Sequence, residues 1–154
     1  YQLFTIVRPN KAYFGQKDYQ QLKIISQMTN DLFPEIEIIS IPIYRDQSGL
    51  ALSSRNNYLS SKDKDTALRL YRNLKIIEED LRNDSSLEDL ARLTSKCNKI
   101  TSDIGEHHKW DYLSILDADT LKEASSETSK ILIAGALYIN KIRLIDNILV
   151  NIQL

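Results

Sequence analysis

The stretch KAYFGQKDYQQLKIISQMTNDLFPEIEIISIPI, residues 11–43, decides the predicted fold because it contains two strand patterns separated by a helix pattern. Lys11–Phe14 predicts a short strand, and a glycine follows it. From Asp18 onward apolar side chains recur at helical spacing, until Pro34 ends the helix. Glu35–Ile43 alternates and then becomes apolar, which is typical of a buried strand. A strand, a helix and a strand in this order predict a βαβ unit and a parallel sheet.

Three pairs of polar residues mark predicted helix starts, because a capping residue is often followed three positions later by a polar partner. The pairs are Asp18 with Gln21, Ser60 with Asp63, and Ser86 with Asp89. We expect the first pair to form a capping box. The second opens a helix of about twenty residues with one apolar face. The third opens another helix, and the same periodicity places Cys97 in the core on its inner face.

The periodicity changes from helical to strand-like beyond Gly105. Tyr112–Leu116, Lys130–Tyr138 and Ile142–Ile148 are predicted strands, and a tight turn joins the last two. Two helices followed by a small antiparallel sheet predict an α+β unit. We therefore expect an α/β protein with a boundary near Arg45, between a parallel βαβ part and an α+β part.

The composition is that of an ordinary globular protein, with 154 residues, 42% hydrophobic and 27% charged. A net charge of -1 argues against a general nucleic-acid binder, so an anion site must be made by a few placed groups. A single cysteine excludes an internal disulfide framework and a cysteine-based zinc site. We recognise no signal peptide and no apolar run near the roughly 20 residues of a membrane span, so we expect the cytoplasm.

The first candidate site is Gly15–Asp18, which lies where a parallel strand ends and a helix begins. The free N–H groups and the dipole of a helix N-terminus favour an anion there. Lys17 adds a positive charge, and Asp18 is able either to cap the helix or to accept a hydrogen bond from a sugar hydroxyl. No glycine-rich loop precedes the lysine, so the segment is not a Walker loop. The alternative is an ordinary surface lysine.

The second candidate site is Gly49–Asn56, with the sequence GLALSSRN. Its last four residues contain two hydroxyls, an arginine and an asparagine. Hydroxyls donate hydrogen bonds to an anion, and a guanidinium binds phosphate bidentately. The alternative is a polar turn that caps the next helix. A phosphate cradle after one strand and a hydroxyl-rich loop after the next predict a crevice that holds a nucleoside triphosphate.

Other polar residues and one glycine receive structural interpretations. We expect His107 and His108 to be exposed in a turn. Asp117 and Asp119 are expected to form a turn at a strand exit rather than a catalytic pair. Gly135, within an apolar strand pattern, indicates either a bulge or a close approach of the backbone to a neighbour.

Four segments, taken in order, resemble the pantothenate synthetase (pantoate–β-alanine ligase) family. They are FGQKDYQQL at Phe14–Leu22, GLALSSRN at Gly49–Asn56, DADTL at Asp117–Leu121 and RLIDN at Arg143–Asn147. The likeness covers essentially the whole chain. It suggests that the chain is the C-terminal portion of a member of this family. It implies that residues 1–44 are the end of a Rossmann-like nucleotide-binding domain. It also implies that residues 45–154 are a C-terminal lid domain of two helices and a small antiparallel sheet.

The resemblance implies an ATP-dependent, AMP-forming ligation of pantoate and β-alanine to pantothenate. In this reaction the pantoate carboxylate attacks the α-phosphate of ATP to form pantoyl adenylate, and the amine of β-alanine then displaces AMP. Magnesium accompanies the triphosphate, and the resemblance implies neither a prosthetic group nor metal ligands from the protein. The family is commonly homodimeric.

The resemblance also implies roles for individual residues. The implied ATP-binding residues are Gly15, Gln16, Lys17, Asp18, Tyr44, Leu52, Ser53, Ser54 and Arg55. The implied catalytic groups among them are Lys17, Ser53, Ser54 and Arg55. Lys17 would lie on the phosphates, Asp18 near the ribose and the backbone of Tyr44 near adenine. Leu52–Arg55 would form the mobile loop that closes over the phosphates, and Gln21 would bind pantoate.

Two departures from the family pattern bear on activity. Gln16 replaces the more usual glutamate with a neutral near-isostere. The family's histidine-containing signature before its first helix is absent, since the only histidines are His107 and His108. Tyr1 is not a methionine, and Leu3–Val7 has the pattern of the end of an element. We therefore expect a fragment that is inactive by itself.

Two alternative functions stay open from the sequence. The first is a non-catalytic C-terminal module that binds a ligand or dimerises. The second is a fragment of an aminoacyl-tRNA synthetase, whose second signature loop has a comparable role. The near-neutral charge argues against tRNA binding, and we expect neither a nucleic acid nor a membrane as partner.

Overall fold

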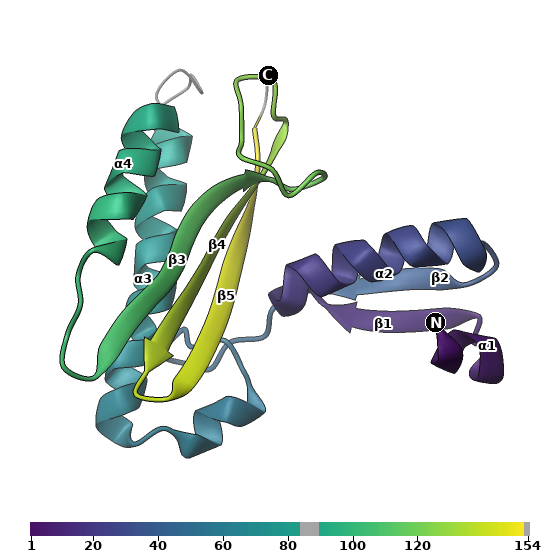
Figure 1. Cartoon of the computed structure of the whole chain (residues 1–154), viewed down its shortest axis with the longest axis horizontal. Helices are drawn as coiled ribbons and strands as arrows, with labels where there is room; N and C mark the ends of the chain where they lie inside the picture. The colour runs from purple at the N-terminus through teal and green to yellow at the C-terminus, as the bar shows by residue number, and fades with distance from the viewer. Residues whose placement is uncertain (84–89, 153–154) are drawn as a thin grey trace. The chain divides into compact units, whose positions relative to one another are not determined.

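The computed structural model describes residues 1–83 and 90–152, which form two compact units. The first unit is Tyr1–Tyr44 and the second is Arg45–Leu154. Each unit has its own sheet, with two strands in the first and three in the second (Figure 1). The predicted α/β class is confirmed at this level. The helix start predicted at Ser86 and Asp89 lies outside the described residues.

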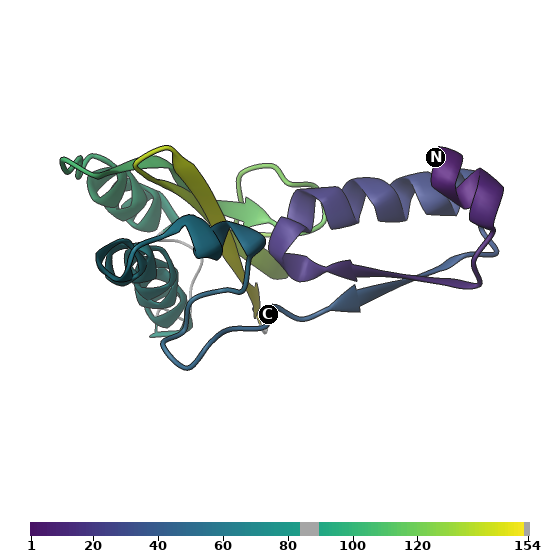
Figure 2. The same cartoon turned by 90° about the horizontal axis from the view of Figure 1, so that it is seen from below.

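The first unit has the predicted strand–helix–strand order. Its elements are helix α1 (Gln2–Val7), strand β1 (Lys11–Gly15), the 3-10 turn η1 (Gln16–Asp18), helix α2 (Tyr19–Leu32) and strand β2 (Glu37–Ile41). The strands are parallel, with Lys11 opposite Glu37 and Gly15 opposite Ile41. Helix α2 lies along one face of this sheet (Figure 2) and buries Tyr19 and Leu22.

Two local predictions for this unit are wrong. Strand β2 was expected to be buried, but all its residues are exposed or half-buried. The reason is that parallel strands become buried only when helices cover both faces, and within this unit one long helix covers one face. The capping box of Asp18 and Gln21 is also absent, because Asp18 makes no side-chain cap hydrogen bond. The preceding turn η1 gives Asp18 φ -94° and ψ 63°, which is not the extended backbone of a capping residue.

The second unit contains two long helices followed by an antiparallel sheet, as predicted. Its elements are η2 (Ser54–Tyr58), α3 (Ser61–Asn83), α4 (Leu90–Thr101), β3 (His108–Asp117), β4 (Lys130–Ile139) and β5 (Ile142–Asn151). The strands pair in the order β3-β4-β5. Ile139 pairs with Ile142, so Asn140 and Lys141 form the predicted tight turn, with Asn140 at φ 52°.

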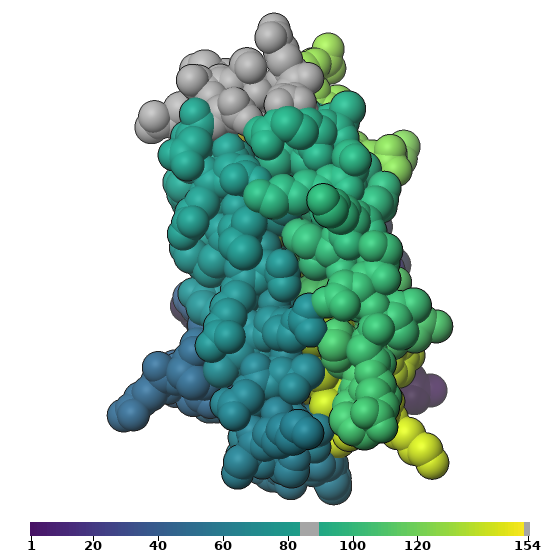
Figure 3. Space-filling model, turned by 90° about the vertical axis from the view of Figure 1, so that its left-hand side faces the viewer, coloured from purple at the N-terminus to yellow at the C-terminus, as the bar shows by residue number. Residues whose placement is uncertain are grey.

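Helix α3 begins where Ser60 and Asp63 predicted a helix start, and these two residues form a capping box. The Ser60 Oγ accepts from the Asp63 N–H at 3.2 Å, and the Asp63 carboxylate accepts from the Ser60 N–H at 3.2 Å. This reciprocal pattern satisfies donors that a helix N-terminus would otherwise leave free. Helices α3 and α4 lie side by side (Figure 3) and pack against one face of the sheet.

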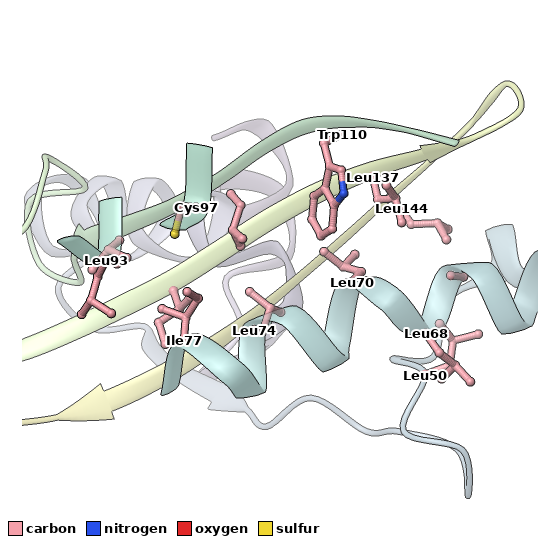
Figure 4. Close-up of a cluster of buried hydrophobic side chains, with 14 of the residues drawn as sticks. Leu50, Leu68, Leu70, Leu74, Ile77, Leu93, Cys97, Trp110, Leu137 and Leu144 are labelled. Carbon is pink, nitrogen blue, oxygen red and sulfur yellow. The ribbon is translucent and has the colours of Figure 1, made fainter. Parts of the chain in front are cut away.

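The core of the second unit lies between these helices and the sheet (Figure 4). Its fully buried side chains include Leu74 and Ile77 of α3, Cys97 of α4 and Leu137 of β4. Burial raises the pKa of the Cys97 thiol to about 11, which fits the predicted core position and keeps the thiol protonated at neutral pH. Ile131, Ile133, Leu137 and Ile139 of β4 belong to the same core, so one face of this strand is directed toward the helices.

Gly135 marks a close approach rather than a bulge. A Cβ at this position would lie 2.9 Å from Leu70 Cδ1 of α3. The pairing of β4 is continuous through Gly135, and the bulge in this sheet lies instead between Trp110 and Tyr112 of β3. The absence of a side chain at Gly135 thus allows α3 to pack closely on the central strand.

The prediction for the histidines is only half right. His107 is exposed, but the His108 side chain is 12% exposed and its Nε2 lies 2.9 Å from Arg69 Nη1. Its ring lies against Gly105, where a Cβ would overlap it. A partner 39 positions away in the chain could not be inferred from the local turn pattern.

The aspartate pair forms the predicted turn. The Asp117 carboxylate accepts from the N–H groups of Asp119 at 3.0 Å and of Thr120 at 2.7 Å.

Within residues 1–83 and 90–152, none of the helices has the length and the apolar character that a membrane span requires.

Candidate functional site

Gly15–Asp18 occupies the junction that the sequence predicted, between the carboxyl end of β1 and the start of α2. Gln16 and Lys17 are half-buried in η1, whereas Asp18 is exposed. The Asp18 carboxylate makes no hydrogen bond within residues 1–83 and 90–152, so it is not used as a helix cap. Gln21 is exposed in the first turn of α2. The helix N-terminus and Lys17 favour an anionic ligand here, whereas the Asp18 carboxylate is suited to accept a hydrogen bond from a hydroxyl group.

The second candidate segment begins with a tight turn of the backbone. Arg45 pairs with Ala51 in an isolated antiparallel bridge, and the Asp46 N–H donates to the Leu50 carbonyl at 3.0 Å. Gly49 has φ 97° and lies against the ring of Tyr71, so a side chain here would be strained and would clash. We call this turn, residues 45–51, the loop base.

The carboxylate of Asp46 organises the loop base from within. Its Oδ1 accepts from the Ser48 N–H at 2.8 Å, the Ser48 hydroxyl at 2.6 Å and the Leu50 N–H at 3.1 Å. The hydrogen bond from the Ser48 hydroxyl is the largest cause that lowers the pKa of Asp46 below its usual 3.8. The turn is therefore built around an ionised carboxylate at neutral pH.

An ion pair fastens the loop base to the rest of the second unit. The Arg45 guanidinium donates to both carboxylate oxygens of Asp146 in β5, at 2.5 and 2.9 Å. It also donates to the Gly49 carbonyl at 3.2 Å and lies 3.9 Å from the centroid of the Tyr71 ring of α3. Leu50 completes the attachment by joining the same buried cluster as Leu68 (Figure 4).

Leu52–Arg55 extends from this fixed base as an exposed segment. Leu52, Ser54 and Arg55 are exposed, and Ser53 is half-buried. Arg55 makes no side-chain hydrogen bond or ion pair within the described part of the chain. The Asn56 side-chain amide donates to the Ala51 carbonyl at 3.0 Å, which closes the segment at its far end.

The helix-cap alternative for this segment is only partly correct. The Ser53 Oγ accepts from the Arg55 N–H at 3.2 Å and so caps the short turn η2. The long helix α3, however, is capped by Ser60. The hydroxyl of Ser54 and the guanidinium of Arg55 take no part in the cap of α3.

The sequence did not reveal the importance of Arg45, Asp146 and Tyr71. Arg45 and Asp146 are 101 positions apart, so no local spacing connects them. One signal was present: Asp146 interrupts the apolar helix-facing side of β5 between Leu144 and Ile148. A charged residue at such a core position requires a buried partner.

The predicted site residues fall in both compact units. Gly15–Asp18 and Gln21 lie in the first unit, and Leu52–Arg55 lies in the second. Tyr44, the last residue of the first unit, has an exposed side chain. Within the described ranges no three His, Cys, Asp or Glu side chains are grouped to hold a metal ion.

The chain is a mixed α/β protein that presents two polar segments, one at a strand end and one on a braced loop. The family model described as pantoate-beta-alanine ligase matches residues 1–149. The chain therefore belongs to the pantoate–β-alanine ligase family. This membership favours the ligase interpretation over the aminoacyl-tRNA synthetase alternative.

Curated relatives and solved structures agree with this assignment. The chain is 45% identical over 147 residues to a pantothenate synthetase of Vesicomyosocius okutanii, covering 96% of this chain and 50% of the relative. It is 36% identical to a crystal structure of pantothenate synthetase from Thermus thermophilus, with a TM-score of 0.78, covering 96% of this chain and 52% of the other. The chain spans about half the length of the curated relatives it matches.

A third similar structure carries ligands. It is pantoate-beta-alanine ligase from Francisella tularensis, whose crystal structure is complexed with beta-gamma ATP and beta-alanine. The chain is 34% identical to it, with a TM-score of 0.60, and the match covers 96% of this chain and 46% of that one.

The lowered pKa of Asp46 predicts a specific dependence of stability on pH. A carboxylate with a lower pKa in the folded state contributes stability above its unfolded pKa and loses it as pH falls through the folded value. The variant Asp46→Asn keeps an acceptor for the turn but has no carboxylate to titrate at this position. The wild type should therefore be the more stable protein at about pH 7, and its advantage should shrink as the pH falls below about 4.

Urea unfolding of both proteins at a series of pH values measures the difference between their free energies of unfolding. The contributions of the other carboxylates cancel in this difference. A difference that stays constant down to about pH 2 would show that the folded pKa of Asp46 is not lowered.

Proposed function

We propose that this chain is the C-terminal portion of an ATP-dependent, AMP-forming ligase that joins pantoate to β-alanine. The observation that carries the proposal is the placement of two cations in a member of this family. Lys17 lies at the strand-end helix N-terminus, and Arg55 projects from a braced loop. The ATP and β-alanine complex of the Francisella tularensis relative supports these two substrates.

The proposed first step transfers the adenylyl group to pantoate. The pantoate carboxylate attacks the α-phosphorus, the bond to pyrophosphate breaks, and pantoyl adenylate forms. Negative charge builds on the phosphoryl oxygens in the transition state, where placed cations and hydroxyl donors stabilise it more than the ground state. Lys17 and Arg55 would supply the cations, and Ser53 and Ser54 the hydroxyl donors.

In the proposed second step the amine of β-alanine attacks the acyl carbon of pantoyl adenylate. The amide bond of pantothenate forms, and AMP leaves with the electron pair of the broken C–O bond. Magnesium would arrive with the triphosphate as part of the substrate. Its charge would offset that of the phosphates, as metal ions do in phosphoryl transfer.

The remaining residues would bind and orient the substrates. Gly15 and Gln16 would contact the phosphates through their backbone, and a backbone contact tolerates glutamine in place of glutamate. Asp18, whose carboxylate is free of any cap, would accept from the ribose. Tyr44 would contact adenine through its backbone, and Gln21 would donate to pantoate. Leu52 would belong to the loop that closes over the phosphates.

We also propose that the complete enzyme is cytoplasmic and acts as a homodimer. The alternative is a non-catalytic module that only associates or holds phosphate weakly. Sedimentation of the purified chain, together with calorimetric titration of ATP, distinguishes the two. An oligomer that binds no ATP would favour the non-catalytic module.

Replacing Lys17 by alanine in the complete enzyme should slow pantoyl adenylate formation by about a hundredfold, because one transition-state donor is lost. Single-turnover formation of the adenylate measures this step directly. The matched control is Lys11→Ala, at the opposite end of β1, which removes a surface ion pair with Glu37 and should change the rate little. Unchanged adenylate kinetics in Lys17→Ala would remove Lys17 from the mechanism.

The 154-residue chain alone should form no pantothenate from ATP, pantoate and β-alanine. The reason is that the family's histidine signature has no counterpart in this sequence, whose two histidines are His107 and His108. A coupled assay for AMP, with the full-length Thermus thermophilus relative as positive control, makes the measurement. Detectable pantothenate from the isolated chain would contradict this part of the proposal.

A further inference from the structure

We infer that Arg45 and Asp146 are positioning residues, whose ion pair holds the loop Leu52–Arg55 in its phosphate-binding arrangement. This inference rests on the proposed function for the purpose of the loop. The bracing itself rests on contacts within the second unit alone. Neither residue is proposed to contact the reacting atoms. Both would affect the reaction only by positioning the loop.

The Arg45 guanidinium joins three parts of the second unit. It donates to Asp146 at 2.5 and 2.9 Å and to the Asn147 carbonyl at 3.4 Å, both in β5. It donates to the Gly49 carbonyl at 3.2 Å in the loop base. It lies over the ring of Tyr71 in α3, a cation–π geometry. One side chain therefore fixes the loop base against a strand and a helix.

The pair is buried enough to impose one geometry. The Arg45 side chain is 18% exposed and that of Asp146 is 4% exposed. The bidentate arrangement matches the fork of a guanidinium to both carboxylate oxygens, which lysine cannot reproduce. Removal of one partner would leave the other charge buried and unpaired, so the wild-type arrangement is strongly preferred.

Asp146 also holds the outer edge of β5. Its Oδ1 accepts from the Asn147 N–H at 2.8 Å, while the Asn147 carbonyl accepts from Arg45. The polar backbone groups of Asn147 are thereby satisfied by the ion pair instead of by another strand. The loop base thus occupies this part of the sheet edge.

The bracing extends directly to the exposed segment. Arg45 pairs with Ala51, and Leu52 is the next residue along the chain. The Ala51 carbonyl also accepts from Asn56, so the segment Leu52–Arg55 begins and ends on the braced Ala51. Loss of the ion pair would loosen both attachments together, and with them the positions of Ser53, Ser54 and Arg55.

A second arginine–aspartate pair of β5, which is more exposed than the pair of Arg45 and Asp146, serves as the control. Arg143 of β5 donates to Asp111 at 3.0 Å, and its guanidinium lies 5.9 Å from the Tyr112 ring. Its partners are on β3 and not on the loop base, and both side chains are about equally exposed, at 41% and 40%. Arg143→Lys therefore makes the same substitution in an arginine–aspartate pair that does not contact the loop base.

Hydrogen exchange of the 154-residue chain, measured by mass spectrometry, tests the bracing without any assay of activity. In Arg45→Lys and in Asp146→Asn, exchange in peptides from residues 46–59 should rise about tenfold, because local opening becomes easier. Exchange in residues 131–139 of β4 should rise by a clearly smaller factor. Arg143→Lys should change neither region.

The inference fails if residues 46–59 keep their wild-type exchange in both variants. It also fails if exchange rises by the same factor in residues 46–59 and 131–139, since the pair would then serve global stability only. Arg45→Lys is the milder variant and retains the charge, so it remains informative if Asp146→Asn does not fold.

Calorimetric titration of the same proteins with Mg–ATP separates the bracing from the function. Arg45→Lys should weaken binding about tenfold, and Arg143→Lys should bind as the wild type does. A wild-type chain that binds no ATP would contradict the proposed phosphate role of the loop. In that case the exchange result would still decide whether Arg45 and Asp146 position it.

Discussion

The bidentate ion pair between Arg45 and Asp146 is the interaction on which the proposed site depends most. It connects the first residue of the second unit to the last strand of its sheet, and the Tyr71 ring covers it. Burial makes such a pair costly to break, so the loop base has one strongly preferred position. A polar, exposed segment can therefore project from a rigid support, as binding loops commonly do.

Much of this fold follows from local periodicity. The βαβ order of the first unit, the three strands of the second and the turn at Asn140 all depend on spacing, which the sequence states directly. The predictions that were wrong concern backbone conformation and burial, which the spacing of apolar residues does not determine. The cap at Asp18 failed because a preceding 3-10 turn changed its backbone, and the burial of β2 failed because burial depends on what covers a face.

For the candidate site, too, some features could be predicted from the sequence and others could not. The two polar segments could be found from residue types alone, because hydroxyls, a lysine and an arginine next to strand ends are suited to phosphate. The support for the second segment could not be found that way, because Arg45 and Asp146 meet only after the sheet has formed. The proposed reaction comes from the family resemblance, and the proposed support of the loop comes from the contacts of Arg45 and Asp146.

The central proposal is that Lys17 and Arg55 both stabilise the charge that builds on the phosphates of ATP during adenylate formation. A double-mutant cycle with Lys17→Ala and Arg55→Ala, measured in the complete enzyme as single-turnover pantoyl adenylate formation, tests it most directly. If both cations stabilise one set of phosphate charges, the double variant should differ from the product of the single effects by about fivefold or more. Effects that multiply within error would show that the two residues act independently, and they would contradict a common role in stabilising the phosphate charge.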